Sequence, residues 1–473
     1  MKSMKLSMLE PVELDAIHQA SLDILKSTGI KFCLPEVLDL FKHHGFTIKE
    51  NKVFFTPRQV ENAIKQVPES FRFSGRNSDR SVLVGDMKVK LQPTMGCIYV
   101  LDPNGHRRKG TNADYIKYQQ LVQYFDTIAI GGAIPIVPGD IPVQNRNMAM
   151  MQAVLKYTDK PIIGWTADKR ESHLMLDLVD MALEDQGGLD CNHAVATGIN
   201  PLSPLCFGEE TLENIMAYAQ RKQPVIVTDA AMAGITAPQS LIGASLQQTV
   251  ECLACTVLCQ LIQPGLPMIW APASTVGYMK RASFCTGAPE NMLINMITNQ
   301  MAREYYNIPT RTLTGHTEAK IIDYQAGVET LQSQLISVLG GAEILSMPLG
   351  SLDSYMTISF EKMLLDEETI RRVLCIQKGV DFSQLDEAVK AIKEIGSEGS
   401  YLTHPTTLAR FRQSWIPDYS EWDSYEGWEK KGSPNLIAKS GEKLSRIMEQ
   451  INTPEMDPEI DKRISEFVQN HIR

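Results

Sequence analysis

The sequence predicts an α/β protein built as a (β/α)8 TIM barrel, with an N-terminal helical cap and a C-terminal helical extension. Two observations lead to this prediction. Eight short apolar runs lack the polar alternation of a half-exposed strand, so they fit parallel strands that are buried on both faces. Segments with helical periodicity separate these runs, and eight such units favour a closed barrel over an open doubly wound sheet.

The predicted strands and helices alternate along the chain. The strands are Lys88–Gln92, Thr127–Ile134, Pro161–Thr166, His193–Ile199, Pro224–Asp229, Pro267–Pro272, Pro309–Thr314 and Ala342–Met347. The helices between and after them are Ala113–Phe125, Val143–Tyr157, Arg170–Glu184, Glu210–Arg221, Gln239–Leu261, Pro289–Tyr306, Tyr324–Leu339 and Phe360–Gln377. The helical spacing of their apolar residues gives each helix one face that can pack against the strands.

Three helices are expected before the barrel. The first ends at Gly29, and the second spans Pro35–His44. A third begins at Thr56-Pro57-Arg58-Gln59, which combines an N-cap residue, a proline at the first helical position and a capping-box glutamine. The expected domains are 1–85 for the helical cap, 86–380 for the catalytic barrel, and 381–473 for an extension of helices and aromatic residues packed on the barrel.

The composition is that of an ordinary globular protein. With 473 residues, 43% of them hydrophobic, the chain can bury a large core. A net charge of -10 without a basic cluster argues against a nucleic-acid partner. Nine irregularly spaced cysteines and the lack of an apolar signal segment at the start are typical of a cytoplasmic protein with reduced thiols. No apolar run approaches about 18 residues, so no membrane span is expected.

Active sites of such barrels lie at the carboxyl ends of the strands, which selects candidate residues without any motif. The side chains that closely follow strands are Gln92, Tyr99, Trp165, Asn200, Asp229, Ser274, His316, Glu318, Tyr355 and Phe360. Several are aromatic and few are cationic. Because a desolvated aromatic face attracts a cation by up to about 2 kcal/mol, such a mouth suits a quaternary ammonium group. The alternative is that these rings simply pack under loops.

Other motifs point away from metal and nucleotide chemistry. Cys252, Cys255 and Cys259 have a spacing that resembles a metal site, yet they share one face of an apolar helix, so we interpret them as core residues. No metal is expected. Phosphate-binding loops and dinucleotide-binding glycine patterns are absent, which argues against nucleotide chemistry. The GxSxG nucleophile elbow is also absent.

His316 is the sharpest single candidate. It follows a predicted strand, precedes a predicted helix, and lies next to Thr317 and Glu318 in a polar loop. Such a histidine can orient the carboxylate of a ligand, or it can only hydrogen-bond its own loop. The sequence leaves both roles open.

The same loop opens a longer run of characteristic residues. The run reads Gly315-His316-Thr-Glu318-Ala-Lys320-x-x-Asp323-x-Gln325-Ala-Gly327-x-Glu329, followed by Gly340-Gly341-Ala342 and by Thr357-x-Ser359-Phe360-Glu361-x-x-x-x-Asp366-Glu367-Glu368. With these residues the chain resembles the trimethylamine methyltransferase superfamily from its N-terminal helices to about Asp366. The resemblance implies a (β/α)8 barrel that transfers a methyl group from a methylated amine to the cobalt of a separate corrinoid protein.

One departure from the family concerns the substrate. The founding trimethylamine enzymes carry pyrrolysine, whereas this sequence has only standard residues. It therefore resembles the non-pyrrolysine branch, whose members demethylate quaternary amines such as glycine betaine, proline betaine, carnitine or γ-butyrobetaine. In that branch a histidine at the end of the last strand can contact the substrate carboxylate. Met347 stands at the corresponding place here, which leaves His316, Asn200 or a lysine for that role, or points to a different substrate.

The expected substrate-binding residues combine the strand-end rule with this resemblance. They are Tyr99, Trp165, Asn200, Asp229, His316, Met347, Tyr355 and Phe360, with Tyr99, Trp165, Tyr355 and Phe360 as the aromatic cage and His316 and Asn200 as carboxylate ligands. No catalytic residue is singled out, because a quaternary ammonium leaves as a neutral tertiary amine and needs no general acid. No cofactor is expected to be bound covalently, since the partner protein supplies the corrinoid, a cobalamin.

Two other functions stay open at this point. One is methyl transfer from the amine to a tetrahydrofolate-type pterin, and the other is quaternary-ammonium binding on an inactive barrel. The expected partners are the amine and a cognate corrinoid protein, without nucleic acid or membrane. Helices at both termini are compatible with a homo-oligomer, but nothing in the sequence specifies its interface.

Overall fold

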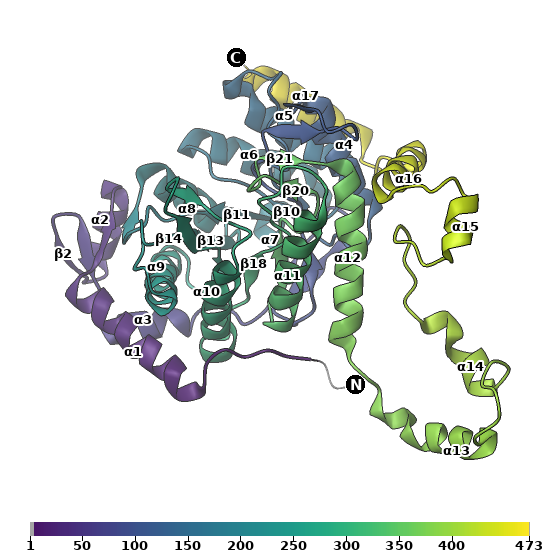
Figure 1. Ribbon diagram of the computed structural model, residues 1–473. Helices are drawn as coiled ribbons and strands as arrows, with labels where there is room; N and C mark the ends of the chain where they lie inside the picture. Colours follow the sequence, from purple (N-terminus) through teal and green to yellow (C-terminus); the bar gives the residue numbers. More distant parts are fainter. Residues whose placement is uncertain (1–3, 473) are drawn as a thin grey trace.

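A closed barrel of eight parallel strands forms the centre of the computed structural model, which describes residues 4–472 (Figure 1). In order around the barrel the strands are β6 (Lys90–Leu91), β9 (Gly131–Gly132), β10 (Ile162–Ile163), β11 (Val195–Ile199), β13 (Val225–Asp229), β15 (Met268–Pro272), β18 (Arg311–Leu313) and β19 (Ile344–Ser346). Ladders join β9 through β15 and β18 through β6. The parallel bridges Leu91–Ile128 and Trp270–Thr310 close the ring. The predicted barrel and its eight strands are confirmed.

Helices surround the barrel, and each lies where the periodicity predicts one. They are α4 (Asn112–Tyr124), α5 (Val143–Tyr157), α6 (Lys169–Ala182), α8 (Glu209–Gln220), α9 (Leu241–Ile262), α10 (Pro289–Gln300), α11 (Tyr324–Leu339) and α12 (Phe360–Lys378). A one-turn helix, α7 (Gly188–Cys191), precedes β11, and a π-helical turn at Met301–Tyr305 extends α10. Helix α9 is long and apolar enough to cross a membrane, but 78% of its most apolar window is buried inside the protein, as in a core helix.

The interior of the barrel is filled by a layer of apolar side chains. Inward-facing residues from the strands meet there, including Ile163, Ala196, Ile226 and Ile269. The hairpin of β4 (Phe71–Phe73) and β5 (Val82–Val84) adds aromatic rings to the same cluster. Because these side chains are buried, we expect a ligand cavity on the side of the layer where the strands end.

The N-terminal segment contains the three expected helices, α1 (Pro11–Ser27), α2 (Pro35–His43) and α3 (Pro57–Ile64). The capping box at the start of α3 is present, with Thr56 Oγ1 accepting from the Gln59 backbone N–H at 3.4 Å. The segment also forms a small sheet, which is absent from the expected elements. It consists of β2 (Thr47–Lys49), β3 (Lys52–Phe54), β1 (Ile30–Phe32) and β12 (Cys206–Phe207).

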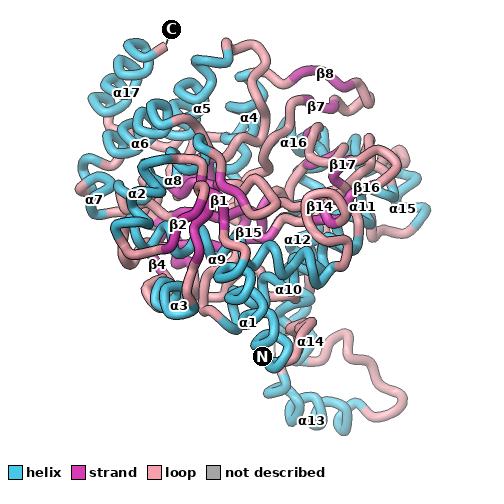
Figure 2. Tube along the Cα trace, turned by 90° about the vertical axis from the view of Figure 1, so that its left-hand side faces the viewer, coloured by secondary structure: helices cyan, strands magenta, loops and turns pink. Residues whose placement is uncertain are grey.

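Short strands outside the barrel lie in the loops that follow the barrel strands (Figure 2). One group is β8 (Arg107–Lys109), β7 (Tyr99–Leu101), β21 (Thr357–Ile358) and β20 (Ser351–Leu352), and another is β14 (Met232–Ala233), β16 (Thr275–Tyr278) and β17 (Ser283–Phe284). They hydrogen-bond loops that are far apart in sequence, so they give the mouth a defined wall.

The C-terminal segment contains α13 (Leu385–Ile395), α14 (Pro405–Arg410), α15 (Tyr425–Lys430), α16 (Leu436–Gln450) and α17 (Pro458–His471). Helix α16 packs against α12, and α17 packs against α5 and α6. The Glu368 carboxylate of α12 accepts the backbone N–H groups of Asp418 and Tyr419, each at 2.6 Å, and so fixes the intervening chain. Helices α13 and α14 stand away from the barrel in both views (Figures 1 and 2). The domain boundaries stay a prediction.

Candidate functional site

A cavity of about 300 Å³ opens where the barrel strands end, and we call it the mouth cavity. Its lining comes from seven of the eight barrel strands or the loops after them, and from two mouth loops. The lining residues are Met95, Gly96, Ile134, Val137, Gly198, Asn200, Thr228, Ala230, Ala273, Phe284, Arg311, Leu313, Met347 and Tyr355. Apolar groups dominate this lining, as in most small-molecule sites. Arg311 is its single charged member.

Arg311 lies on β18 with its side chain inside the barrel, and it is 2% exposed. Its Nε donates to Gln92 Oε1 at 2.8 Å, Nη1 to Thr228 Oγ1 at 3.0 Å, and Nη2 to Ser346 Oγ at 2.7 Å. All three acceptors are neutral. Within residues 4–472, no carboxylate forms an ion pair with this guanidinium. Burial lowers the pKa of Arg311 to about 10, so it is still a cation at neutral pH.

Two aromatic rings line the cavity along with Arg311. Phe284 and Tyr355 meet edge to face, with ring centroids 6.3 Å apart. Tyr355 closes a run of three non-glycine residues with positive φ, Asp353 (56°), Ser354 (51°) and Tyr355 (58°). Such backbone is unfavourable and persists where the surroundings hold it, which is common at ligand sites.

Contacts from the neighbouring loop hold this strained run in place. Ala319 and Thr317 accept the backbone N–H groups of Asp353 and Ser354 at 2.9 and 3.0 Å. The Ser354 hydroxyl donates to the Glu318 carboxylate at 2.5 Å. Glu318 also accepts the Thr286 backbone N–H at 2.8 Å, which ties the loop that follows β17 to the same carboxylate. The polar loop therefore positions Tyr355 and Phe284 together.

His316 is buried behind Tyr355, outside the cavity lining, with ring centroids 5.7 Å apart. Neither ring nitrogen has a hydrogen-bond partner among the described residues. Burial, with a smaller effect of the Lys362 charge, lowers the pKa of His316 to about 3. The imidazole is therefore neutral near pH 7 and supports the ring of Tyr355 from behind.

Asp229 lies at the end of β13, between the lining residues Thr228 and Ala230, and is itself fully buried. Its Oδ1 accepts from the Ala231 backbone N–H at 3.2 Å and from the Ser274 hydroxyl at 3.3 Å. Burial and then the nearby Glu251 carboxylate raise the pKa of Asp229 well above its ordinary value. Both effects disfavour a negative charge on this carboxyl group beside the cavity.

A family model described as trimethylamine methyltransferase (MTTB) matches residues 2–473. The chain belongs to the trimethylamine methyltransferase family. The glycine betaine methyltransferase of Desulfitobacterium hafniense (strain Y51) is 30% identical over 468 residues, which cover 98% of this chain and 97% of that protein. This agrees with the resemblance carried by the loop motif.

Two further comparisons bear on the family and on the fold. The proline betaine:corrinoid methyltransferase of Eubacterium limosum is 30% identical over 419 residues, covering 85% of each chain. The crystal structure of the Methanosarcina barkeri monomethylamine methyltransferase gives a TM-score of 0.54 at 11% identity and covers 95% of this chain and 89% of that chain. At that identity the likeness supports the barrel fold alone.

In this family member the structure brings part of the predicted set together. Asn200, Met347 and Tyr355 line the mouth cavity, and Asp229 and His316 lie directly behind its wall.

Three predicted cage residues lie elsewhere. The Arg107 guanidinium lies over the Tyr99 ring, 3.9 Å from its centroid, and the Lys117 ammonium lies over the Phe360 ring, 4.2 Å from its centroid. The Trp165 indole N–H donates to Asn147 Oδ1 at 2.8 Å within a core cluster. None of the three is in the cavity lining. Of the four rings expected to form the cage, only Tyr355 lines the cavity, and the second ring there is Phe284.

Arg311, Phe284 and Met95 also line the cavity, although none of them is among the residues expected from the sequence. The sequence does contain a sign of Arg311, because it is a charged residue in the middle of a predicted buried strand. A buried charge needs hydrogen-bond or charged partners. Phe284 and Met95 carried no such signal, because they lie in loops after the strands and only the folded mouth brings them inward.

The structure also shows where the cysteines of α9 lie. Cys252, Cys255 and Cys259 are fully buried in the apolar core, as predicted, and burial raises the pKa of Cys252. In the part of the chain that the structure describes, no group of three or more His, Cys, Asp or Glu side chains has the geometry to hold a metal ion.

Proposed function

We propose that this protein transfers an N-methyl group from a betaine, a zwitterion with a quaternary ammonium and a carboxylate, to a cognate corrinoid protein in the cytoplasm. The main support for the proposal is that one small cavity is lined by two aromatic rings and by a buried guanidinium that has no carboxylate partner. The names of the relatives, glycine betaine, proline betaine and L-carnitine methyltransferases, support the same class.

Arg311 is the proposed anchor for the substrate carboxylate. A guanidinium has five N–H donors, and four contacts occupy four of them. One of those contacts is to the Met95 thioether at 3.1 Å, a weak acceptor that a carboxylate oxygen can replace. Charge-assisted hydrogen bonds to a carboxylate are roughly twice as strong as neutral ones. The bonds to Gln92 and Ser346 hold the guanidinium in place before the substrate arrives.

The aromatic rings suit the ammonium end of the same molecule. A quaternary ammonium donates no N–H bond, so it gains from π faces and apolar walls, by about 0.5–2 kcal/mol for each ring contact. Tyr355, Phe284 and Met347 supply such surfaces in the cavity. The positive charge of Arg311 repels the ammonium, so the zwitterion binds with its carboxylate inward and its methyl groups toward the rings.

The chemistry needs positioning more than proton transfer. The corrinoid supplies a reduced cobalt that accepts the methyl group, while the electron pair of the broken C–N bond stays on nitrogen. The leaving tertiary amine is neutral, so no general acid is required. The cavity holds the substrate in one orientation and replaces its water by apolar side chains, which are the two effects such a displacement needs. A cavity of about 300 Å³ is at the small end for ligand sites and accommodates the amine, with the corrinoid outside.

Trimethylamine fits this site poorly. It lacks a carboxylate, so its binding would leave Arg311 without an anionic partner, and its protonated form would add a second cation to a cavity whose single charge is already positive. Leaving a buried charge without its partner costs about 2–5 kcal/mol, which is enough to discriminate strongly against simple amines.

The test follows methylcobalamin formation by absorbance after reduced cob(I)alamin is added to the purified protein. The substrates compared are glycine betaine, proline betaine, carnitine, γ-butyrobetaine, choline and trimethylamine. We expect methyl transfer with at least one betaine and little with choline, which is quaternary but has no carboxylate. Equal rates with choline and the betaines would contradict the proposed anchor.

A second arm addresses the acceptor. If free cobalamin gives no product, the assay is repeated with corrinoid proteins encoded next to this chain. Product formed with tetrahydrofolate and no corrinoid would establish the pterin alternative. Betaine binding without transfer to any acceptor would establish an inactive binding barrel.

A further inference from the structure

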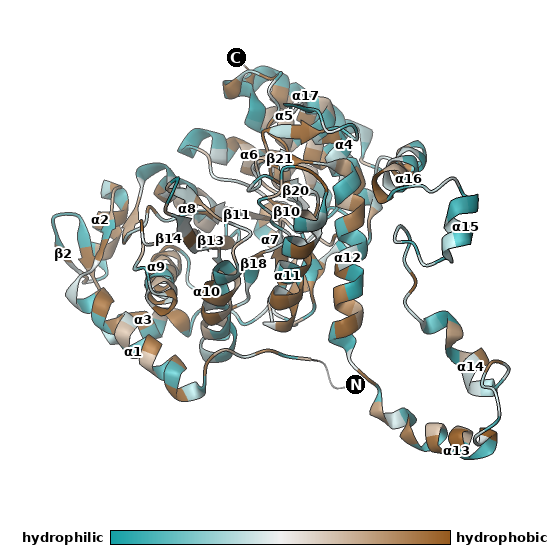
Figure 3. Cartoon of the chain, in the orientation of Figure 1, coloured by the Kyte–Doolittle hydropathy of each residue, from teal (hydrophilic) through white to brown (hydrophobic). Residues whose placement is uncertain are grey.

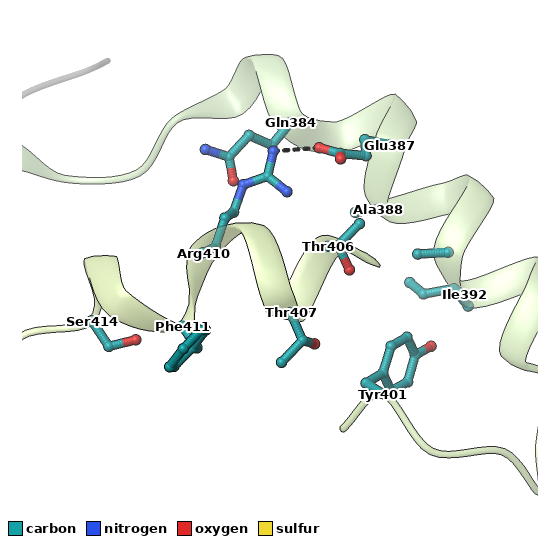
Figure 4. A pocket seen from close by; sticks show the side chains of 11 residues that line it. Gln384, Glu387, Ala388, Ile392, Tyr401, Thr406, Thr407, Arg410, Phe411 and Ser414 are labelled. Atoms are coloured by element: carbon teal, nitrogen blue, oxygen red, sulfur yellow. Dashed lines mark hydrogen bonds and ion pairs between the residues drawn. The ribbon is translucent and has the colours of Figure 1, made fainter. Parts of the chain in front are cut away.

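Residues 381–414, which we call the arm, contain α13 and α14 and project from the barrel (Figures 1 and 2). Within residues 4–472, the hydrogen bonds and ion pairs of the arm are internal to it. Arg410 of α14 pairs with Glu387 of α13, as Figure 4 shows, and His404 lies 3.5 Å from Glu394. The arm is therefore a small unit with its own internal contacts, and it is not strapped to the barrel by polar groups.

Helix α13 and the turn before it carry hydrophobic residues, brown in Figure 3, and several of these side chains are exposed. The exposed fractions are 78% for Phe382, 50% for Leu385 and 40% for Val389. Their spacing of three or four residues places them in one stripe along the helix. The other side of α13 faces α14 across a groove lined by Gln384, Ala388 and Ile392 (Figure 4). An exposed apolar stripe of this kind marks an interaction surface.

The arm leaves the barrel at the end opposite the mouth. Helix α12 begins at Phe360, after the mouth strand β21, and its 19 residues carry the chain roughly 28 Å. Near its end, the Met4 backbone N–H donates to the Gln377 carbonyl, and the Leu6 N–H donates to Leu339, at the end of α11 just before β19 begins. A protein that delivers a methyl acceptor to the mouth approaches from the other side, so the stripe serves a different partner.

One acidic and one basic residue beside the stripe can form ion pairs with a second copy of the same helix. Asp386 and Lys393 are seven residues apart, so they flank the stripe on the same side, two turns from each other. Neither takes part in an ion pair in the described part of the chain, whereas Glu387 and Glu394 do. In an antiparallel pair of α13 helices related by a two-fold axis, Asp386 of each copy faces Lys393 of the other.

We propose that the arm is a self-association surface. A second copy of this chain packs its α13 antiparallel against the first, which covers both apolar stripes around Val389 and forms two equivalent Asp386–Lys393 pairs. This is an isologous contact that closes as a dimer. The near balance of five acidic and four basic residues in the arm favours such a contact in a chain whose net charge is -10. The proposal does not depend on the methyl-transfer activity.

Sedimentation velocity over a wide range of protein concentration tests the proposal. We expect the wild-type protein to be a dimer, and Val389→Glu and Leu385→Glu to be monomers with unchanged circular dichroism. Val12→Glu, the same change at a 72% exposed valine of α1, is the matched control and stays dimeric. A monomeric wild type, or dimeric arm variants, would overturn the assignment.

A charge exchange provides the second test. Asp386→Lys alone and Lys393→Asp alone each create two like-charge contacts across the axis and should weaken dimerisation by at least about tenfold. The double variant restores both pairs and should recover most of the affinity, a rescue that a folding defect does not produce. Variants that stay dimeric but lose methyl transfer to the corrinoid protein would instead assign the arm to that protein.

Discussion

The two ends of the barrel both bury cations, but they treat them differently. At the end where the strands begin, Lys90 contacts Asp86 at 2.5 Å and Glu343 at 2.9 Å, and Arg303 lies 3.6 Å from the same glutamate. At the mouth, Arg311 has only neutral acceptors. In the first set each cation has a carboxylate partner within the chain. The second leaves a positive charge without its anion, which is what a site for a carboxylate requires before the ligand binds.

The two sets of buried cations differ in role: one stabilises the barrel and the other lines the cavity. Lys90 on β6 and Glu343 next to β19 join the two strands whose pairing closes the ring, so their ion pair strengthens the closure. Arg311 on β18 joins Gln92 and Ser346 at the next level toward the mouth, where the cavity begins. Barrels commonly place structural residues at the first end and active-site residues at the second.

The largest effect is expected from Arg311→Met. Loss of the carboxylate anchor should lower kcat/KM for the betaine by roughly a thousandfold, about 4 kcal/mol. The preference for betaine over choline should disappear as well. Because the variant removes a buried charge that has no carboxylate partner, its Tm should be unchanged or higher. Arg311→Lys keeps the charge without the forked donors and should be intermediate. An Arg311→Met variant with full activity would show that the cation at the mouth does not anchor the substrate.

The reciprocal change is Lys90→Met. It leaves the Glu343 carboxylate with the more distant Arg303, so the free energy of unfolding should fall by about 3 kcal/mol. Urea unfolding measures that loss. Steady-state assays well below the melting temperature should give a wild-type kcat/KM, since the mouth is unaltered. A loss of activity in the folded variant would contradict the separation of roles.

A pH effect should distinguish the mouth from the opposite end. The pKa of His316 is about 3 in the folded protein and about 6.5 when unfolded, so the unfolded state binds more protons between these values. Stability from this group is fully present above pH 6.5 and is lost as pH falls, by about 2 kcal/mol between pH 7 and pH 5. His316→Gln should flatten the dependence of Tm on pH in that window, and an equally steep dependence in the variant would refute the assignment.

The smallest effect is expected at the aromatic side of the cavity. Tyr355→Leu removes one ring contact with the ammonium and should raise the betaine Kd by about fivefold, or about 1 kcal/mol. Tyr355→Phe keeps the ring in the same strained backbone position and serves as the control. Isothermal titration with glycine betaine measures both variants. Equal affinities for the leucine and phenylalanine variants would show that the ring face does not hold the ammonium.

The sequence by itself determined the barrel, because strand and helix periodicities are local. Each predicted strand and helix of the repeating part lies within a few residues of its observed position, and the capping box at Thr56 starts α3 as expected. The loop motif from Gly315 to Glu329 also indicated the family, and Glu318 within it hydrogen-bonds Ser354 next to the cavity-lining Tyr355.

Only the tertiary structure decided which side chains share the mouth cavity. Closure of the ring turns Arg311 inward, next to Gln92 and Thr228 from distant strands, and no local pattern encodes that meeting. The same closure leaves Trp165 and Phe360 in core clusters, although both follow strands as closely as Asn200 does. A position after a strand fixes the height of a residue in the barrel, whereas the direction of its side chain depends on neighbours that come from other parts of the chain.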